Sequence, residues 1–582
     1  MRASGFRCSS SIVELTLSVA RVRTRSVWRD SLDPEPMSRR TISLVLASIA
    51  AASCSHAPPR TATVAQQGAP ASRPMRYDPT GSINTAELRR DLSVIADDSF
   101  RGRETGTAEA RRAAAYIARR VQLMGLEPAG DSLYLQRVPM VRQTFARATQ
   151  LTVTRNDGQR QSLRVGVDVT PIISFGTEAP APSRDVDSDV LYVGNGPDDD
   201  RQAMALLPLN PQGRVLVTSI VTPDEKLTDP VARAVRDSIM TMRMARMISL
   251  RPGAIVVLVQ GELEKTFQRQ LRTLLKQIVL DAPEPTDSGP PMPMILFGMA
   301  RRGSPLLPAR WPNDQAPQLL DRQFTGHIEI NRTPFTAYNV VAVVRGHDPK
   351  LNKTFLAYGA HYDHIGILPP EPRKDRRGVR DSIANGADDD GSGSVALLAI
   401  AQQMAVSRPR RSVLFVWHVG EEQGMLGSKY FTSHSPMPID SIVAQFNADM
   451  IGRNDANMVG LVGPRAAPNY QSWRLGMIVD SVNRASPSPL RIERKWDDPD
   501  DPEHIYKRSD HYSYATKGIP IIFFTSGEHE DYHRVSDEVS KIDYDKIARV
   551  AQLMLESGLA VSNRSTRPTS EALTESISSR QP

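Results

Sequence analysis

The stretch Phe355-Leu-Ala-Tyr-Gly-Ala-His-Tyr-Asp363 runs from an apolar segment directly into a histidine and an aspartate. Short apolar segments of this kind are typical of strands that are buried on both faces of a sheet. Three more apolar segments lead into Glu421-Glu422, Asp449 and the segment that contains His533. Because ligands of open α/β sheets gather at the carboxyl ends of the strands, we expect these side chains to converge.

Amphipathic segments alternate with these strands, so the sequence predicts an α/β fold with an open, mostly parallel twisted sheet covered by helices. The predicted strands are Asn339–Val344, Phe355–Gly359, Ser412–Val419, Ile442–Asn447 and Ile519–Thr525. The predicted helices are Gly393–Ala405 and Tyr544–Leu559, and a further helix should begin after an N-cap at Thr107 and stop at Gly125.

Residues 150–330 have a different pattern, in which short Val, Leu and Ile runs are separated by turns that contain Pro and Gly. This pattern predicts a β-rich inserted domain, with strand candidates at Val190–Val193, Val215–Val217, Ala254–Val259 and Met294–Phe297. The segment contains no cluster of His, Cys or acidic residues that would indicate chemistry, so we expect a structural or substrate-gating role.

The chain of 582 residues is too long for one hydrophobic core. We interpret it as an upstream extension and export signal (1–53), a flexible tether (54–84), a helical lead-in (85–149), the β-rich insert (150–330), a catalytic domain (331–562) and a disordered tail (563–582).

The net charge of +7 does not indicate a nucleic-acid partner. Residues 1–53 hold eight Arg against four acidic residues, so they contribute 8 − 4 = +4, and 7 − 4 = +3 is spread over the rest of the chain. The two cysteines, Cys8 and Cys54, both lie near the N-terminus, so the sequence offers no disulfide framework.

The segment Met37-Ser-Arg-Arg40, followed by the apolar run Thr41–Ala52, has the order of charge and hydrophobicity of a bacterial export signal. We expect translation to begin at Met37, with residues 1–36 as an upstream extension. Ala51-Ala-Ser-Cys54 resembles a lipoprotein cleavage box, although Ala51 replaces the usual large aliphatic residue. We therefore expect an exported protein that a lipid on Cys54 anchors to a membrane, periplasmic or on the cell surface and most simply at the outer membrane. A plain signal peptide is the alternative.

A further acidic segment, Asn385-Gly-Ala-Asp-Asp-Asp-Gly-Ser-Gly393, places three Asp residues in a glycine-rich loop before a helix. So many carboxylates in one turn repel one another unless a cation lies among them. An exposed helix cap would need only one of them.

Five segments in this order resemble the di-zinc peptidase family of secreted bacterial aminopeptidases, glutamate carboxypeptidase and the glutaminyl cyclases. They are Gly359–Gly366, Asn385–Gly393, Gly420–Ser428, Asn447–Gly452 and Tyr532-His533, and the likeness extends from Asn339 to Leu559. It implies a fold of the zinc exopeptidase type, two Zn²⁺ ions per chain and peptide substrates.

The resemblance implies that one zinc is bound by His361 and Asp449, the other by Glu422 and His533, and that Asp389 bridges both. Asp388 or Asp390 is a less favoured bridging residue. The peptide bond after the bridging aspartate is often cis in this family, which would be Asp389–Asp390 here. Imidazole and carboxylate are ligands that zinc accepts in catalytic sites.

The family also implies catalytic roles. Adjacent side chains diverge, so when Glu422 binds metal, Glu421 can act as the general base that moves a proton from water to the leaving amine. Tyr532 would hydrogen-bond the oxyanion, and Asp363 would orient the imidazole of His361. His364 and Ser509-Asp510-His511 match supporting positions, whereas His418 is interpreted as a core histidine.

Two further segments resemble the same family. Arg101-Gly-Arg-Glu-Thr-Gly106, followed by the predicted helix, is similar to the lead-in of these enzymes. The insert resembles their protease-associated domain by pattern alone.

Several alternatives remain open from sequence. His529-Glu-Asp-Tyr-His533 matches the H-E-x-x-H pattern of another zinc protease class, which requires a helix that the surrounding residues do not predict. Within the family, an aminopeptidase is the favoured activity, followed by a carboxypeptidase, a single-zinc glutaminyl cyclase and a receptor-like protein without metal.

Overall fold

The computed structural model describes residues 82–172, 183–222, 230–282, 292–368, 381–467 and 471–568. The predicted export signal, Cys54 and residues 569–582 lie outside the described residues. In the described helices, no segment is both long and apolar enough to cross a membrane.

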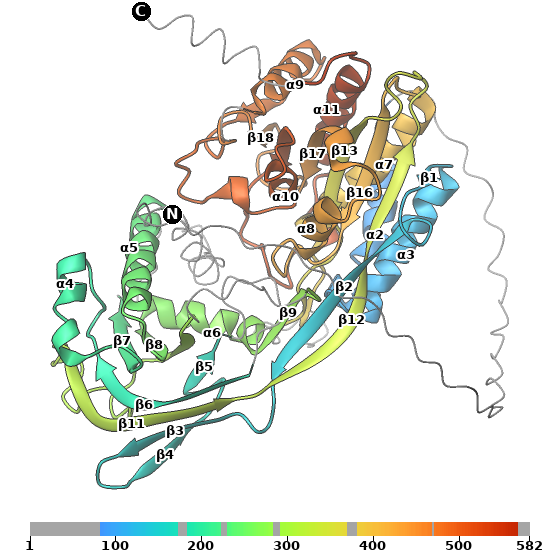
Figure 1. Ribbon diagram of the computed structural model, residues 1–582. Helices are drawn as coiled ribbons and strands as arrows, with labels where there is room; N and C mark the ends of the chain where they lie inside the picture. Colours follow the sequence, from blue (N-terminus) through green and yellow to red (C-terminus); the bar gives the residue numbers. More distant parts are fainter. Residues whose placement is uncertain are drawn as a thin grey trace, which may run out of the picture.

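The larger of two main sheets has ten strands, and four neighbouring central strands are parallel (Figure 1). In spatial order these four are β20 (Ile521–Thr525), β17 (Ile442–Ala448), β13 (Phe355–His361) and β16 (Ser412–His418). Every residue of the four strands is buried, as expected for parallel strands with both faces covered.

Antiparallel pairs extend this sheet on both sides. On one side lie β12 (Ile330–Val344), β2 (Leu135–Phe145) and β9 (Lys276–Leu280), with β1 (Glu127–Pro128) also paired to β12. On the other side β18 (Met458–Val462) is antiparallel to β20, and β19 (Arg491–Glu493) is parallel to β18. The predicted α/β class is confirmed, with a mixed sheet that is parallel at its centre.

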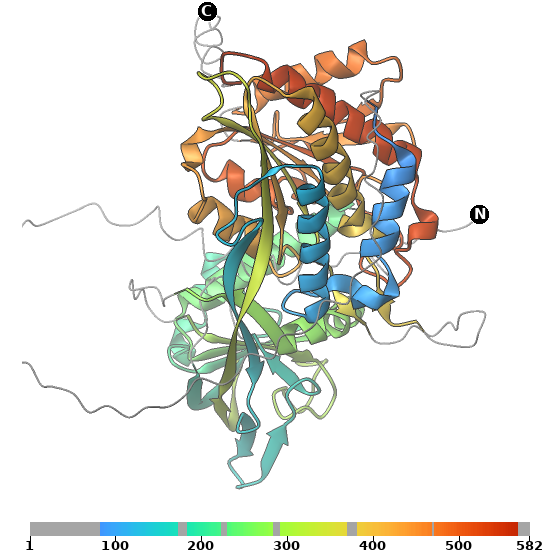
Figure 2. The ribbon, with the colours of Figure 1, turned by 90° about the vertical axis from the view of Figure 1, so that its right-hand side faces the viewer.

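Helices cover both faces of the sheet. Five pack on one face, where Figure 2 shows the amino-terminal pair in blue beside later helices: α2 (Thr85–Ile95), α3 (Ala108–Leu123), α7 (Gly393–Ser407), α9 (Trp473–Ala485) and α11 (Tyr544–Ser562). The opposite face is covered by α8 (Leu426–Ser433) and α10 (His511–Ala515). The predicted N-cap is confirmed, since Oγ1 of Thr107 accepts from the N–H of Ala110, and Gly125 follows α3 with a φ of +76°.

The second main sheet is built from residues 150–328 and has eight strands. Their spatial order is β4 (Arg160–Leu163), β3 (Gln150–Arg155), β11 (Gln318–Ile328), β6 (Arg184–Tyr192), β7 (Val215–Val221), β8 (Ala254–Gln260), β10 (Met294–Met299) and β5 (Val169–Pro171). Three of the four apolar runs noted in the sequence lie within β7, β8 and β10, and the fourth, Val190–Val193, extends one residue past the end of β6.

The insert also contains three helices that the apolar runs did not predict: α4 (Asp200–Met204), α5 (Pro230–Ser249) and α6 (Glu262–Leu275). In α5, Met240, Met244 and Met247 are buried at a spacing of four and three residues, which is the helical pattern. The purely β-rich interpretation was therefore incomplete.

The two sheets are joined by strands that continue from one to the other (Figure 1). A single residue, Glu329, separates β11 from β12, and β12 pairs with β2 from Ile330–Phe145 to Val340–Leu135. In addition β9, which follows α6 of the insert, pairs with β2 in the larger sheet. The predicted boundary at residue 330 thus falls within continuous structure, because β12 begins nine residues before the apolar run that predicted it.

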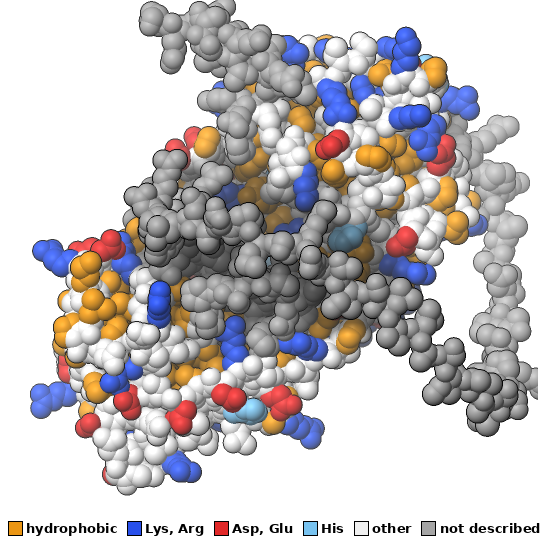
Figure 3. Space-filling model, in the orientation of Figure 1, with side chains coloured by type: hydrophobic (Ala, Val, Ile, Leu, Met, Phe, Trp, Pro, Cys, Tyr) orange, Lys and Arg blue, Asp and Glu red, His pale blue; other side chains and the backbone are white. Residues whose placement is uncertain are grey.

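Shorter elements complete the described chain. The helical turns are η1 (Asp98–Arg103), η2 (Leu207–Leu209), η3 (Ala387–Ser392), η4 (Ile439–Ser441), η6 (Ile505–Lys507) and η7 (Val539–Lys541), and β14 (Gly366–Ile367) pairs with β15 (Ile383–Ala384). On the face in Figure 3, basic and acidic side chains are scattered over both parts of the molecule.

Candidate metal centre

The acidic and histidine side chains noted in the sequence meet where the central strands end. His361 is the last residue of β13, Glu421 and Glu422 follow β16, and Asp449 follows β17. His533 lies in the segment after β20, and Asp389 lies in η3 just before α7. These placements follow the rule that ligands gather at the carboxyl edge of parallel strands.

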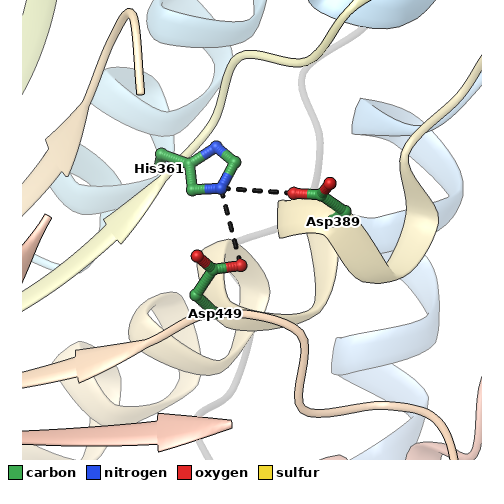
Figure 4. A group of neighbouring side chains, drawn as sticks. All are labelled: His361, Asp389 and Asp449. Carbon is green, nitrogen blue, oxygen red and sulfur yellow. Dashed lines mark ion pairs between the residues drawn. The ribbon is translucent and has the colours of Figure 1, made fainter. Parts of the chain in front are cut away.

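Asp389 lies at the centre of the group and faces two histidines with its two carboxylate oxygens. Oδ1 is 3.3 Å from Nε2 of His361, and Oδ2 is 3.2 Å from Nε2 of His533. His361 Nε2 is also 3.5 Å from Oδ1 of Asp449 (Figure 4), and His533 Nε2 is 3.0 Å from Oε2 of Glu422. The five residues therefore form two groups of donors that share one carboxylate.

The donors have the chemistry of a zinc site. Ligand atoms about 2.0–2.2 Å from a tetrahedral zinc lie roughly 3.3 Å from one another, which is close to the separations here. Oδ2 of Asp389 and Oδ1 of Asp449 are buried without a hydrogen-bond donor among the described residues. Buried carboxylate oxygens of this kind are costly unless a cation is nearby, so these residues fit a divalent metal.

The neighbouring aspartates point away from this centre. Asp388 Oδ1 accepts from the N–H of Gly452 at 2.6 Å, and Asp390 accepts from the N–H groups of Gly393 and His361. Of the three Asp residues, Asp389 is thus the one shared by the two groups, and its bond to Asp390 is cis, as the resemblance implied.

Asp537 supports the aspartate loop, a role that could not be predicted from its sequence position. Its carboxylate accepts from the N–H groups of Asp388 and Asp389 at 3.0–3.1 Å. Its pKa is raised to about 6, chiefly by burial and then by the charge of Asp388. Nothing but its place four residues after His533 could have suggested it.

Glu421 and Glu422 diverge, as expected for adjacent residues. Burial opposes ionisation of Glu422, but His533 and the hydrogen bond from His364 outweigh it and lower the pKa of Glu422 to about 2. Burial, reinforced by Glu422 and Asp449, raises the pKa of Glu421 well above its usual value. Oε2 of Glu421 lies 4.0 Å from Nε2 of His361, beside the group rather than within it.

The imidazole of His361 is oriented differently from the prediction. Its Nδ1 lies 3.1 Å from the backbone carbonyl oxygen of Asp363 and 3.8 Å from the carboxylate. The Asp363 carboxylate instead accepts from Oγ1 of Thr105 at 2.6 Å and from the N–H of Glu421 at 3.3 Å. Asp363 thus contacts the histidine through its backbone and Glu421 through its side chain.

His364 lies closer to the centre than a distant supporting group would. Its Nδ1 is 2.8 Å from Oε1 of Glu422 and 3.7 Å from Oδ2 of Asp389, and its Nε2 is buried without a partner among the described residues. His364, Asp389 and Glu422 therefore form a second compact set of donors beside His361, Asp389 and Asp449.

Asp449 is held in place by a chain of hydrogen-bonded polar side chains. Oγ of Ser509 donates to Oδ2 of Asp449 at 2.7 Å, and Nδ2 of Asn447 donates to Oγ of Ser509 at 3.0 Å. This chain leaves Oδ1 of Asp449 directed at His361 (Figure 4).

His418 is buried within the sheet. Its Nδ1 lies 3.3 Å from Asp510 and its Nε2 3.0 Å from the hydroxyl of Tyr514, so it is a buried core histidine, as the apolar strand predicted. His511 is also buried, and its Nε2 lies 2.9 Å from the backbone carbonyl oxygen of Tyr506.

Tyr532 packs against the centre, with its ring stacked on that of His533 at a centroid distance of 3.9 Å. Burial raises its pKa well above the usual value for a phenol. The hydroxyl therefore stays protonated and able to donate.

His529 and His533 do not form a pair on a helix. Residues 526–537 are turns and irregular backbone, and Nε2 of His529 lies 3.3 Å from Oδ2 of Asp388 while His533 faces Asp389 and Glu422. The alternative based on the H-E-x-x-H pattern is therefore wrong.

Comparison with known proteins agrees with this geometry. Residues 339–558 match the model of peptidase family M28, and the larger sheet with its helices has an M28-like fold. The solved aminopeptidase from Aneurinibacillus sp. strain AM-1 has a TM-score of 0.50 and 16% identity, over 84% of this chain and 96% of that chain.

Curated relatives have similar sequences over the same region. A probable leucine aminopeptidase of Trichophyton verrucosum is 26% identical over 42% of this chain and 64% of its own length. Leucine aminopeptidase 1 of Aspergillus fumigatus is 27% identical over 42% of this chain and 62% of its own length. The chain thus spans less than two thirds of these relatives.

Proposed function

We propose that this protein is a two-zinc aminopeptidase. The observation that carries the proposal is the position of Asp389, whose two carboxylate oxygens face His361 and His533 at 3.3 and 3.2 Å. A bridging carboxylate between two donor groups is the arrangement that a pair of metal ions requires. His361 and Asp449 would hold one zinc, Glu422 and His533 the other, and Asp389 both.

The zinc ions, when bound, supply Lewis acidity that acidifies water and polarises a carbonyl group. Glu421 is the acid best placed to handle the proton, because its carboxylate lies 4.0 Å from His361 Nε2 and its backbone is held by Asp363. It accepts a proton from the attacking water and delivers it to the amine that leaves.

Tyr532 supplies a hydrogen-bond donor beside this centre. Its ring is fixed by stacking on His533, so the hydroxyl is held in place before substrate arrives. We assign it to the carbonyl oxygen of the scissile bond, which gains negative charge during attack.

The choice of an aminopeptidase over a carboxypeptidase rests on the relatives, two of which are named as leucine aminopeptidases. On this basis the preferred substrate is a peptide with a free α-amine and an apolar first residue such as leucine.

A panel of leucyl substrates tests the proposal, with the amine either free or acetylated, on wild type and Glu421→Gln. We expect cleavage of the free substrates only, and a large loss of kcat in the variant with zinc retained. Cleavage of blocked peptides would overturn the aminopeptidase assignment, and full turnover by Glu421→Gln would overturn the role of Glu421.

Zinc content separates the remaining alternatives. Two ions per purified chain support the peptidase, one indicates a glutaminyl cyclase, and none indicates a receptor-like protein.

We also propose that the protein is exported and anchored through a lipid on Cys54, and that the insert is protease-associated-like and limits access to the site. The first proposal is supported by the sequence of residues 37–54 alone. Incorporation of labelled fatty acid by wild type but not by Cys54→Ala would support it, and a secreted, unlabelled wild type would contradict it.

A further inference from the structure

Arg103 is a fully buried arginine whose guanidinium group contacts backbone carbonyls. Nε donates to the carbonyl of Tyr362 at 2.7 Å, and the two terminal nitrogens donate to those of Ile95, Asn385 and Gly386 at 2.6–2.9 Å. In the described part of the chain, it forms no ion pair with a carboxylate. A buried cation without such a pair is costly, so its position requires a structural reason.

The carbonyls that Arg103 binds belong to the segments that carry the central donors. Tyr362 directly follows His361, and Asn385 and Gly386 lie four and three residues before Asp389. Ile95 ends α2, where the last carbonyls of a helix are unpaired and carry partial negative charge. The planar guanidinium, with donors in a fixed fork, therefore links both loops to the end of a helix.

The turn that presents Arg103 is fitted closely to its surroundings. Arg101, Gly102 and Arg103 all have positive φ values, 48°, 70° and 46°, and a Cβ on Gly102 would lie 2.4 Å from the carbonyl oxygen of Ala384. Non-glycine residues adopt this conformation only where the surrounding contacts outweigh its cost. The N–H of His364 also donates to the carbonyl of Arg103, so the turn is bonded to the loop after β13 in both directions.

The charge of Arg103 complements the acidic centre. The guanidinium interacts favourably with Asp363, Asp537 and Asp389 without touching them. It therefore offsets part of the repulsion among carboxylates that must lie close together.

We propose that Arg103 is a positioning residue that holds the His361 loop and the Asp389 loop at the separation that the metal pair needs. It contacts neither ion nor substrate and acts through the backbone carbonyls of Tyr362, Asn385 and Gly386. This inference rests on the proposed function, because it concerns the same zinc ligands.

The test compares Arg103→Met and Arg103→Lys with Arg120→Met as a matched control. Arg120 is also buried, but it pairs with Asp91 at 3.0 Å between α3 and α2, away from the donors. Zinc affinity is measured by chelator competition on the folded proteins, and the visible spectrum of cobalt-loaded protein reports the ligand geometry.

We expect both Arg103 variants to bind zinc about 10- to 100-fold more weakly, with an altered cobalt spectrum. Lys keeps the charge but cannot span three segments from one nitrogen, so Arg103→Lys separates geometry from charge and is the variant expected to fold. Arg120→Met should lose stability and keep both metal readouts.

Zinc affinity and a cobalt spectrum like those of wild type in Arg103→Lys would overturn the inference, whatever the behaviour of Arg103→Met. An equal loss of affinity in Arg120→Met would also overturn it, because the effect would then follow general destabilisation. Wild type that binds no zinc would contradict the proposed function itself, and the inference with it.

Discussion

The backbone N–H of Glu421 donates to Oδ1 of Asp363 at 3.3 Å, so one acidic residue fixes the position of another. The second oxygen of Asp363 accepts from Thr105 at 2.6 Å. The loop after β16, the loop after β13 and the amino-terminal segment are thereby connected at a single carboxylate.

Asp363→Asn should lower kcat by roughly 10- to 100-fold with little change in KM, because an amide cannot accept from both donors and Glu421 loses its support. Steady-state kinetics on a leucyl substrate measures this. The exposed Asp185→Asn serves as the control, and an unchanged kcat in Asp363→Asn would contradict the assignment.

Ser509→Ala should weaken zinc binding by about ten-fold, because Asp449 loses the donor that leaves Oδ1 directed at His361. Ser428→Ala is the matched control, since Ser428 is also buried but pairs with Ser513. Chelator competition gives both affinities, and equal values for the two variants would argue against a role for Ser509.

Removal of zinc by a chelator should abolish activity and lower the melting temperature. A ligand present at 100 times its Kd stabilises the folded state by about 2.7 kcal/mol. Calorimetry with and without added zinc measures the shift, and activity should return fully only at two ions per chain. Full activity in metal-free protein would be inconsistent with the proposed chemistry.

Lys276→Met should reduce the stability of the contact between the insert and the lead-in segment. Lys276 in β9 forms an ion pair with Glu104, and both side chains are partly buried. A double-mutant cycle with Glu104→Gln should give a coupling of roughly 1 kcal/mol in the free energy of unfolding. Strictly additive effects would show that the pair contributes nothing.

Glu538→Gln should stabilise the metal-free protein at high pH. Burial raises the pKa of Glu538 from 4.5 to about 7, so the folded protein keeps a proton that the unfolded chain has lost. The cost of ionising Glu538 in the folded state grows from about pH 4.5 and is complete above about pH 7. Urea unfolding should therefore show a gain for the variant at pH 8.5 and none at pH 4, and the reverse order would contradict this sign.

The convergence of the strand ends could be predicted, because the edge of a parallel sheet is one place in space. His361 and Asp449 follow apolar runs directly, and those runs are strands in the structure. The loop with three consecutive aspartates could be identified as a cation site because the three carboxylates repel one another. Residue type and spacing were therefore enough to predict where the strands end and which side chains lie there.

The supporting contacts could not be predicted in the same way. Arg103 binds backbone carbonyls, which any residue provides, and Asp537 binds backbone N–H groups. The edge strand β9 and helix α5 could not be predicted from continuous apolar runs, because neither element contains a run that stands out from its surroundings. Half-buried elements such as Lys276–Leu280 leave no such run.

The ladder between β2 and β12 has a mechanical consequence. The two strands are hydrogen-bonded from Ile330 to Val340, and β12 is separated from β11 by one residue, so this connection between the two sheets resists bending. A rotation of the insert that separates β2 from β12 would break the hydrogen bonds between these strands. A small change of twist along the two strands would keep them. If the insert limits access to the site, as proposed above, such a change of twist is the motion that would alter that access.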